Sequence, residues 1–211
     1  MLKKNNMKIF ILCGGFGTRL DHEGKLKAKP MIKIGNEPIL MHIIKNFVAQ
    51  GFDEFVLCLG YKSESIINFF IKQKKRNIQI VKKEKNYIKF RFRNKKLRFI
   101  GNLIFTGINT GTGGRILTSY KTLDLNEDFI MTYGDGLSNV NIKKLIRFHF
   151  RNKSEVTLTA VRPKQRYGII KIIKNRVGFF DNSKKKSDVY INGGFFVISK
   201  NAVKRIKNKN I

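Results

Sequence analysis

Short apolar runs alternate with segments of helical periodicity in the first part of the chain. Residues 7–13 form an apolar run, interrupted only by Lys8, that ends in glycines, which is typical of a buried parallel strand. A helical pattern begins at Pro38 and stops before Gly51, which is the expected use of proline and glycine at the two ends of a helix. Residues 54–59 then predict a second strand.

The same alternation continues to about residue 150. Ser63 is a candidate cap for a helix over residues 64–75, whose apolar side chains recur at helical spacing. The basic, alternating stretch 78–100 predicts exposed hairpins. Further strands are predicted at 102–106 and 129–133, and further helices at 113–123 and 141–152.

Strands dominate the last part of the sequence. They are predicted at 155–161, 168–173, 177–180 and 189–199, followed by a short helix at 201–207. Alternating strands and helices predict an α/β fold with a Rossmann-like, mainly parallel sheet covered by helices on both faces, plus a β-rich C-terminal portion. Because no repeat or linker is visible, we expect one domain over residues 1–211, with a first half at 7–150 and a β-rich portion at 151–211.

The composition excludes several classes of protein. Apolar residues make up 42% of the chain, which excludes a disordered tail. No stretch approaches the roughly 18 apolar residues that a membrane helix needs, and no signal peptide is visible. Cys13 and Cys58 are the two cysteines, and each lies inside an apolar run. This pattern favours buried thiols in the reducing cytoplasm over a disulfide.

The net charge of +30 raises the question of nucleic-acid binding, because a dense basic surface binds phosphate backbones. Most of the 44 basic residues are lysines, and they are spread along the chain instead of being gathered in one arm. Solvated faces are therefore the favoured interpretation, and attraction of anionic substrates is a weaker one. A nonspecific nucleic-acid binder stays open as an alternative that rests on charge alone.

A glycine-rich loop follows the first predicted strand. Its residues are Gly14, Gly15, Phe16, Gly17, Thr18, Arg19 and Leu20. Ligands of such sheets bind at the carboxyl ends of strands, where glycines let backbone N–H groups approach a phosphate and Arg19 offers a cationic fork. The nucleoside-triphosphate P-loop pattern is absent, and Leu20 stands where the dinucleotide fingerprint needs its third glycine.

A lysine motif eight residues after this loop makes the pattern specific. The combined pattern, GGFGTRL followed by Lys29-Pro30-Met31, resembles the signature of the sugar-1-phosphate nucleotidylyltransferases. The resemblance implies that the loop wraps the nucleotide triphosphate. It also implies two catalytic residues: Arg19 would hold the departing pyrophosphate, and Lys29 would contact phosphate at the reacting centre.

An aspartate between two glycines ends the strand predicted at 129–133. A turn-forming Asp-Gly is the ordinary reading of Asp135 and Gly136. Asp135 also matches the Gly-Asp metal position of the family, and magnesium prefers one or two carboxylates together with waters and phosphates. The resemblance therefore implies Mg²⁺ as cofactor, held by Asp135. The three histidines, His22, His42 and His149, have no ligand partners at metal-binding spacing and are expected in ordinary roles.

Further stretches resemble the glucose-1-phosphate cytidylyltransferases within this family, namely residues 38–43, 58–62, 106–115, 129–136 with 139–142, and 190–197. The resemblance implies transfer of a nucleotidyl group from CTP to glucose 1-phosphate, in a cytoplasmic pathway towards dideoxy sugars of surface polysaccharide. The implied nucleotide site comprises Leu12, Cys13, Gly14, Gly15, Phe16, Gly17, Thr18, Thr110, Arg115 and Gly134. The implied sugar site comprises Gly168, Asn192 and Gly193.

Two departures from the family pattern keep alternatives open. Asn182 and Ser183 stand where the family has Glu and Lys, and the chain ends at Ile211 before the segment that carries a second metal-binding aspartate and part of the subunit contacts. We therefore expect a fragment or an altered copy of an enzyme that is a homo-oligomer in its full-length form. The alternatives are a transferase that uses UTP, dTTP or GTP, and an inactive nucleotide-sugar-binding module.

Overall fold

The computed structural model describes residues 7–16, 27–72, 77–163, 169–174, 176–181 and 189–208. The chain divides into two compact units, of which one comprises Met1–Thr157 with Gly194–Ile211 and the other comprises Leu158–Gly193. The first unit contains the parallel strands and the helices described below. The expected division of one domain at residue 150 stays a prediction.

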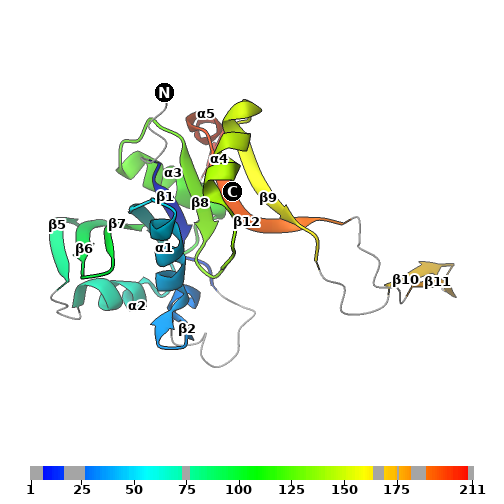
Figure 1. Cartoon of the computed structure of the whole chain (residues 1–211), viewed down its shortest axis with the longest axis horizontal. Helices are drawn as coiled ribbons and strands as arrows, with labels where there is room; N and C mark the ends of the chain where they lie inside the picture. Colours follow the sequence, from blue (N-terminus) through cyan, green and yellow to red (C-terminus); the bar gives the residue numbers. More distant parts are fainter. Residues whose placement is uncertain are drawn as a thin grey trace. The chain divides into compact units, whose positions relative to one another are not determined.

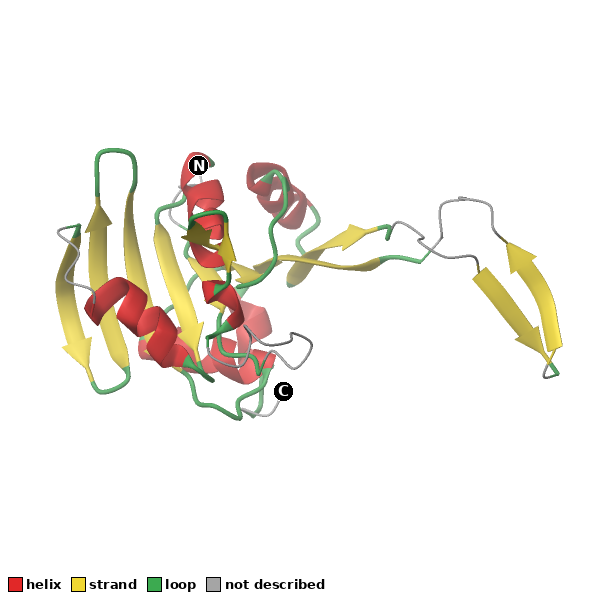
Figure 2. Ribbon diagram, turned by 90° about the horizontal axis from the view of Figure 1, so that it is seen from below, coloured by secondary structure: helices red, strands yellow, loops and turns green. Residues whose placement is uncertain are grey.

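An eight-stranded sheet has the order β5-β6-β7-β4-β1-β8-β12-β9 (Figures 1 and 2). Its strands are β1 (Ile9–Leu12), β4 (Glu54–Leu59), β5 (Ile78–Glu84), β6 (Tyr87–Arg93), β7 (Arg98–Phe105), β8 (Phe129–Tyr133), β9 (Val156–Val161) and β12 (Ile191–Ile198). The four central strands β7, β4, β1 and β8 are parallel, whereas the β5–β6, β6–β7 and β8–β12 pairs are antiparallel. The sheet is therefore mixed, with its parallel strands at the centre.

Helices lie between and after the central strands along the chain. They are α1 (Ile39–Ala49), α2 (Ser63–Ile67) with the π-helical turn η3 (Asn68–Lys72), α3 (Thr112–Thr122), α4 (Ile142–Arg151) and α5 (Lys200–Lys204). The smaller elements are the 3-10 turn η2 (Lys29–Met31), the hairpin β2 (Lys33–Ile34) and β3 (Glu37–Pro38), and the hairpin β10 (Ile169–Ile173) and β11 (Arg176–Asp181). Within the described ranges, no helix combines the length and the apolar character that a membrane crossing demands.

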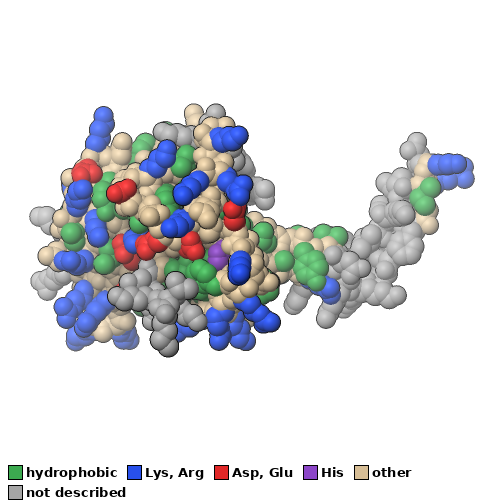
Figure 3. All heavy atoms as spheres, turned by 90° about the horizontal axis from the view of Figure 1, so that it is seen from above, with side chains coloured by type: hydrophobic (Ala, Val, Ile, Leu, Met, Phe, Trp, Pro, Cys, Tyr) green, Lys and Arg blue, Asp and Glu red, His purple; other side chains and the backbone are tan. Residues whose placement is uncertain are grey.

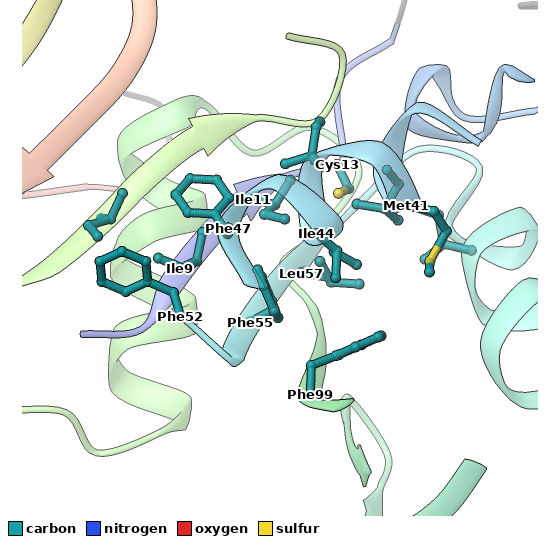
Figure 4. Close-up of a cluster of buried hydrophobic side chains, with 14 of the residues drawn as sticks. Ile9, Ile11, Cys13, Met41, Ile44, Phe47, Phe52, Phe55, Leu57 and Phe99 are labelled. Atoms are coloured by element: carbon teal, nitrogen blue, oxygen red, sulfur yellow. The ribbon is translucent and has the colours of Figure 1, made fainter. Parts of the chain in front are cut away.

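The core consists of two apolar clusters, one on each face of the sheet. Because successive strand side chains point to opposite faces, Ile9 and Ile11 of β1 belong to one cluster and Phe10 to the other. The first cluster includes Ile44 and Phe47 of α1, which pack on β1 and β4 (Figure 4). The second cluster holds α3 and α5 against the other face, through residues such as Ile116 and Val203. Helices thus cover both faces, which confirms the predicted α/β class.

Two local predictions need correction. Ser63 does not cap α2 but is its first residue, and the cap position is Lys62, whose φ of 56° is left-handed. The chain turns sharply after β4, and the Ser65 hydroxyl donates to the Lys62 carbonyl in this turn at 2.8 Å. The stretch 78–100 does form hairpins, but they are not simply exposed, because Phe90 of β6 is fully buried against the ring of Phe70.

Basic side chains are scattered over one face of the molecule. On the face shown in Figure 3, lysine and arginine side chains are separated by other residues and do not form one continuous patch. This distribution agrees with the interpretation of the charge as solvated surface. It gives no support to a dedicated nucleic-acid-binding face on this side of the protein.

Candidate active site

The carboxyl ends of the parallel strands meet at one edge of the sheet. Leu12 at the end of β1 is in register with Cys58 of β4 on one side and with Tyr133 of β8 on the other. From β1 the chain runs through α1 to β4, whereas β8 joins the opposite side of β1 after α3. A sheet whose strand order reverses in this way has a crevice outside the carboxyl ends of the strands at the reversal, and ligands bind there.

A pocket of about 310 Å³ lies at this position. It is built by the loop after β1, the turn η2, the start of α3 and the end of β8. The residues that line it are Leu12, Cys13, Gly15, Phe16, Lys29, Pro30, Thr110, Gly111, Thr112, Arg115, Tyr133 and Asp135. The structure therefore brings together four segments that are far apart in the sequence, and three of them carry motifs from which the sequence predicted a phosphate site.

Lys29 and Asp135 face each other in this pocket. Lys29 Nζ lies 3.6 Å from Asp135 Oδ2, and the two side chains are 25% and 46% exposed. Gly134 makes this approach possible, because a Cβ at that position would come within 2.6 Å of Pro30 Cγ and 2.9 Å of the Leu12 carbonyl oxygen. The glycine before Asp135 thus lets the turn η2 pack directly on the end of β8.

Backbone hydrogen bonds fix the position of Lys29. The Met31 and Ile32 N–H groups donate to the Ala28 and Lys29 carbonyls, at 2.8 and 3.0 Å, and close the turn η2. The Ala28 N–H donates to the Ser65 hydroxyl of α2 at 3.2 Å. Lys29 is therefore held on an ordered turn while its ammonium group stays partly open to solvent and to a ligand.

The N-terminus of α3 adds positive potential to the pocket. Gly111 occupies the cap position without a side-chain hydrogen bond, and Thr112 is the first helical residue. Both residues line the pocket, so the first N–H groups of an 11-residue helix lie beside it. Such N–H groups and the aligned peptide dipoles favour a bound anion. The pocket thus offers this helix terminus and Lys29 to phosphate.

Arg115 lies in the first turn of α3 and is only 5% exposed. Its guanidinium donates hydrogen bonds to the carbonyls of Gly14, Leu59, Gly107 and Ile108 and to the Thr106 hydroxyl, over 2.8–3.2 Å. Burial lowers the pKa of this guanidinium from its ordinary value. An arginine nevertheless stays protonated at neutral pH, so a buried positive charge lies at the wall of the pocket.

The other predicted site residues are distributed as follows. Gly17, Thr18, Arg19 and Gly168 lie outside the described residues, as do Asn182 and Ser183. Asn192 and Gly193 lie on β12 in the second compact unit. The roles assigned to all of these residues stay predictions.

Four pocket residues were missed by the sequence analysis. Pro30, Gly111, Thr112 and Tyr133 line the pocket without having been assigned a role. Each of them adjoins a predicted site residue in the sequence, or lies two positions from one. The signal that could have found them was therefore present, since a loop that binds a ligand presents several consecutive residues to it.

The histidines of the described chain have ordinary roles. His42 Nε2 lies 3.0 Å from the Ile34 carbonyl, and the buried His149 Nδ1 lies 2.9 Å from the Thr157 hydroxyl. Burial lowers the pKa of His149 below its ordinary value, and this effect is opposed by the charge of Asp128. Neither histidine lines the pocket.

Both cysteines are buried and unpaired, as predicted. Burial raises the pKa of Cys58 to about 12, and burial, Cys58 and Asp135 together raise that of Cys13 well above its ordinary value. A thiol with a raised pKa stabilises the fold fully below its unfolded-state pKa, and this contribution is lost as the pH rises through the folded-state value.

We therefore expect neither thiol to react with Ellman's reagent in the folded protein at about pH 8, because the thiolate is the reactive species. Both thiols should react after unfolding in guanidinium chloride. The measurement is the number of thiols modified, with and without denaturant. Rapid reaction of Cys13 in the folded protein would show that the pocket wall exposes its sulfur.

Comparison with known proteins agrees with this geometry. Glucose-1-phosphate cytidylyltransferase of Salmonella typhimurium is 35% identical over 207 residues, which cover 96% of this chain and 79% of that protein. The probable glucose-1-phosphate cytidylyltransferase of Bacillus subtilis is 36% identical over 194 residues, which cover 92% of this chain and 75% of that protein.

The fold has relatives among solved structures. HddC from Yersinia pseudotuberculosis superposes with a TM-score of 0.68 at 24% identity, covering 97% of this chain and 82% of that one. A second structure of that protein, in complex with GMP-PN, has a TM-score of 0.63 at 25% identity. The sequence profile of the nucleotidyl transferase family matches residues 8–210. The chain therefore belongs to the nucleotidyl transferase family.

Proposed function

We propose that this protein transfers a cytidylyl group from CTP to glucose 1-phosphate, giving CDP-glucose and pyrophosphate. The observation that carries the proposal is the convergence of Lys29 and Asp135 on one pocket walled by the glycine loop and the N-terminus of α3. Positive groups and free N–H groups in that arrangement suit a polyphosphate. The identities of 35% and 36% to cytidylyltransferases support CTP and glucose 1-phosphate as substrates.

The reaction is a substitution at the α-phosphorus of CTP. An oxygen of the sugar phosphate forms the new bond to this phosphorus, and the bond to the oxygen that bridges the α- and β-phosphates breaks. Its electron pair leaves with pyrophosphate. The attacking phosphate is already an anion, so no general base is required, and catalysis depends on positioning and on offsetting charge. Lys29 is placed to offset the charge that builds up at the phosphates, and Arg19 would assist the departing pyrophosphate.

Asp135 suits a magnesium ion that is shared with substrate. Magnesium binds proteins through one or two carboxylates and takes its other ligands from phosphates and water. Asp135 presents a half-exposed carboxylate to the pocket, and the described ranges contain no group of three or more His, Cys, Asp or Glu side chains that could form a protein-only cage. When bound there, Mg²⁺ would neutralise phosphate charge and polarise the phosphate oxygens.

Nucleotide preference tests the proposal directly. We expect pyrophosphate release from CTP with glucose 1-phosphate and Mg²⁺, at a rate well above that with UTP, dTTP or GTP at equal concentration. The measurement is a coupled pyrophosphate assay with each triphosphate in turn. Omitting the sugar phosphate is the control, because transfer to that acceptor, and not hydrolysis, should produce the signal.

Each other outcome points to a different function. A preference for GTP would favour a guanylyltransferase, which is worth testing because the structural relative HddC was solved with GMP-PN. A rise in melting temperature with CTP but no pyrophosphate would indicate an inactive nucleotide-binding module. Salt-sensitive DNA binding that CTP does not compete would favour the nucleic-acid alternative that the charge of +30 left open.

A further inference from the structure

The Arg115 side chain joins three chain segments beneath the pocket. Its Nη2 donates to the Gly14 carbonyl after β1 at 2.9 Å. Its Nη1 donates to the Leu59 carbonyl at the end of β4 at 3.2 Å and to the Thr106 hydroxyl after β7 at 2.8 Å. Further bonds reach two carbonyls in the loop that leads from β7 into α3. One guanidinium thus ties together the ends of three neighbouring parallel strands.

Two glycines make room for this guanidinium. A Cβ at Gly14 would come within 2.3 Å of Arg115 Nη1, and a Cβ at Gly60 would come within 2.2 Å of the same atom. Gly60 directly follows β4 and does not line the pocket. The absence of a side chain at Gly14 is therefore explained by Arg115 and not by phosphate alone. Gly60, which carried no prediction, is required for the same reason.

All five hydrogen bonds of the guanidinium end on neutral protein oxygens. Within the described ranges, no carboxylate forms an ion pair with Arg115. Three of these contacts come from Nη1 and two from Nη2, so both terminal nitrogens, with their four N–H donors, are engaged by backbone and hydroxyl acceptors. The Nε–H, the fifth donor, takes part in none of these five contacts.

We propose that Arg115 is a positioning residue, which holds the loop after β1 in the shape that binds phosphate. Through the Gly14 carbonyl it sets the path of Gly15 and Phe16, both of which line the pocket. This inference rests on the proposed function, because the loop it positions is the one assigned to the nucleotide. It adds a structural role to the sequence-based expectation, in which Arg115 belonged to the nucleotide site by position.

A double-mutant cycle between Arg115 and Gly60 tests the inference. The methyl group of Gly60→Ala would displace the guanidinium from the space beside Gly14 and Gly60, and it adds no group to the pocket. We expect it to lower kcat with CTP and glucose 1-phosphate by about 10²-fold, since a displacement of about 1 Å can have that effect. Arg115→Met should lower kcat at least as much. Adding Gly60→Ala to Arg115→Met should then change kcat less than threefold, because the guanidinium that the new methyl group would displace is already absent.

Additive effects in this cycle, or a Gly60→Ala variant with normal kcat, would overturn the inference. So would an Arg115→Met variant that raises only the KM for CTP and keeps a normal kcat, because an effect on binding alone would identify a direct ligand. If Arg115→Met does not fold, Arg115→Lys replaces it, because one ammonium group keeps the charge but cannot bridge three loops. The surface variant Arg91→Met is the control and should keep normal kcat and KM.

Chemical rescue separates positioning from a loss of stability. Millimolar guanidinium added to Arg115→Ala should increase kcat at least tenfold, whereas ammonium at the same ionic strength should not. Rescue by neither ion would contradict the role of the guanidinium.

If the unmodified protein releases no pyrophosphate, the proposed function fails and this inference is judged separately. The same cycle is then measured on the free energy of unfolding, where additivity of Gly60→Ala and Arg115→Met would overturn it.

Discussion

Replacing Asp135 with asparagine is expected to lower kcat by about 10²–10³-fold while leaving the fold intact. The loss of one preorganised electrostatic contact at a transition state typically has an effect of this size. Asparagine has nearly the same shape but lacks the charge that would hold Mg²⁺ against phosphate oxygens. Because Asp135 is about half exposed, its ion pair with Lys29 contributes no more than about 1 kcal/mol to stability. The melting temperature should therefore shift by only about 2–4 °C.

Turnover is measured by pyrophosphate release at saturating CTP and glucose 1-phosphate, and the melting temperature by thermal unfolding of the same sample. Asp124→Asn is the matched control. Asp124 lies in the turn after α3 with φ at 47°, a conformation that asparagine adopts readily, and it does not line the pocket. Its replacement should leave both quantities unchanged. Near-normal turnover of Asp135→Asn would remove Asp135 from the catalytic machinery.

The helices and strands of this fold were predictable where the spacing of apolar residues agrees with the polar, glycine or proline residues that border them. Residues 54–59 and 129–133 were predicted as strands with the bounds that β4 and β8 have, because each is a short apolar run bordered by polar or glycine residues. The cap of α2 was not predictable in this way. Ser63 is a good cap by composition, but the turn after β4 places Lys62 at that position in a left-handed conformation.

The candidate site likewise contains residues that the sequence could identify and one, Arg115, whose role it could not. The glycine loop and Asp135 could be found from sequence because the carboxyl ends of parallel strands meet at one edge, whereas Lys29 was found through the resemblance of its motif to the family signature. The interior role of Arg115 could not be found. Its partners are four backbone carbonyls and one hydroxyl, and no residue type marks a carbonyl that will accept a bond from a distant side chain. Only the packing of Gly14 and Gly60 around the guanidinium reveals it.

Replacing Lys29 with methionine should lower kcat by about 10²–10³-fold, the same order as Asp135→Asn. Methionine keeps much of the length and apolar stem of lysine but removes the ammonium that faces the pocket. If Lys29 acts on charge that develops at the reacting phosphates, the loss appears in kcat. A lysine that only helped to bind substrates would instead raise KM and leave kcat unchanged. Lys33→Met, on the exposed strand β2 just after the turn η2, is the control and should behave like the unmodified protein.

The double variant Lys29→Met with Asp135→Asn carries this prediction further. Groups that act together on one transition state are strongly non-additive, so the second substitution should add far less than its own 10²–10³-fold effect. Two groups acting on independent steps would give the product of both losses. The 3.6 Å separation of Lys29 Nζ and Asp135 Oδ2 places both charges on one small region of the substrate and predicts the first result. Fully multiplicative losses would mean that the ammonium and the carboxylate do not serve the same phosphate group.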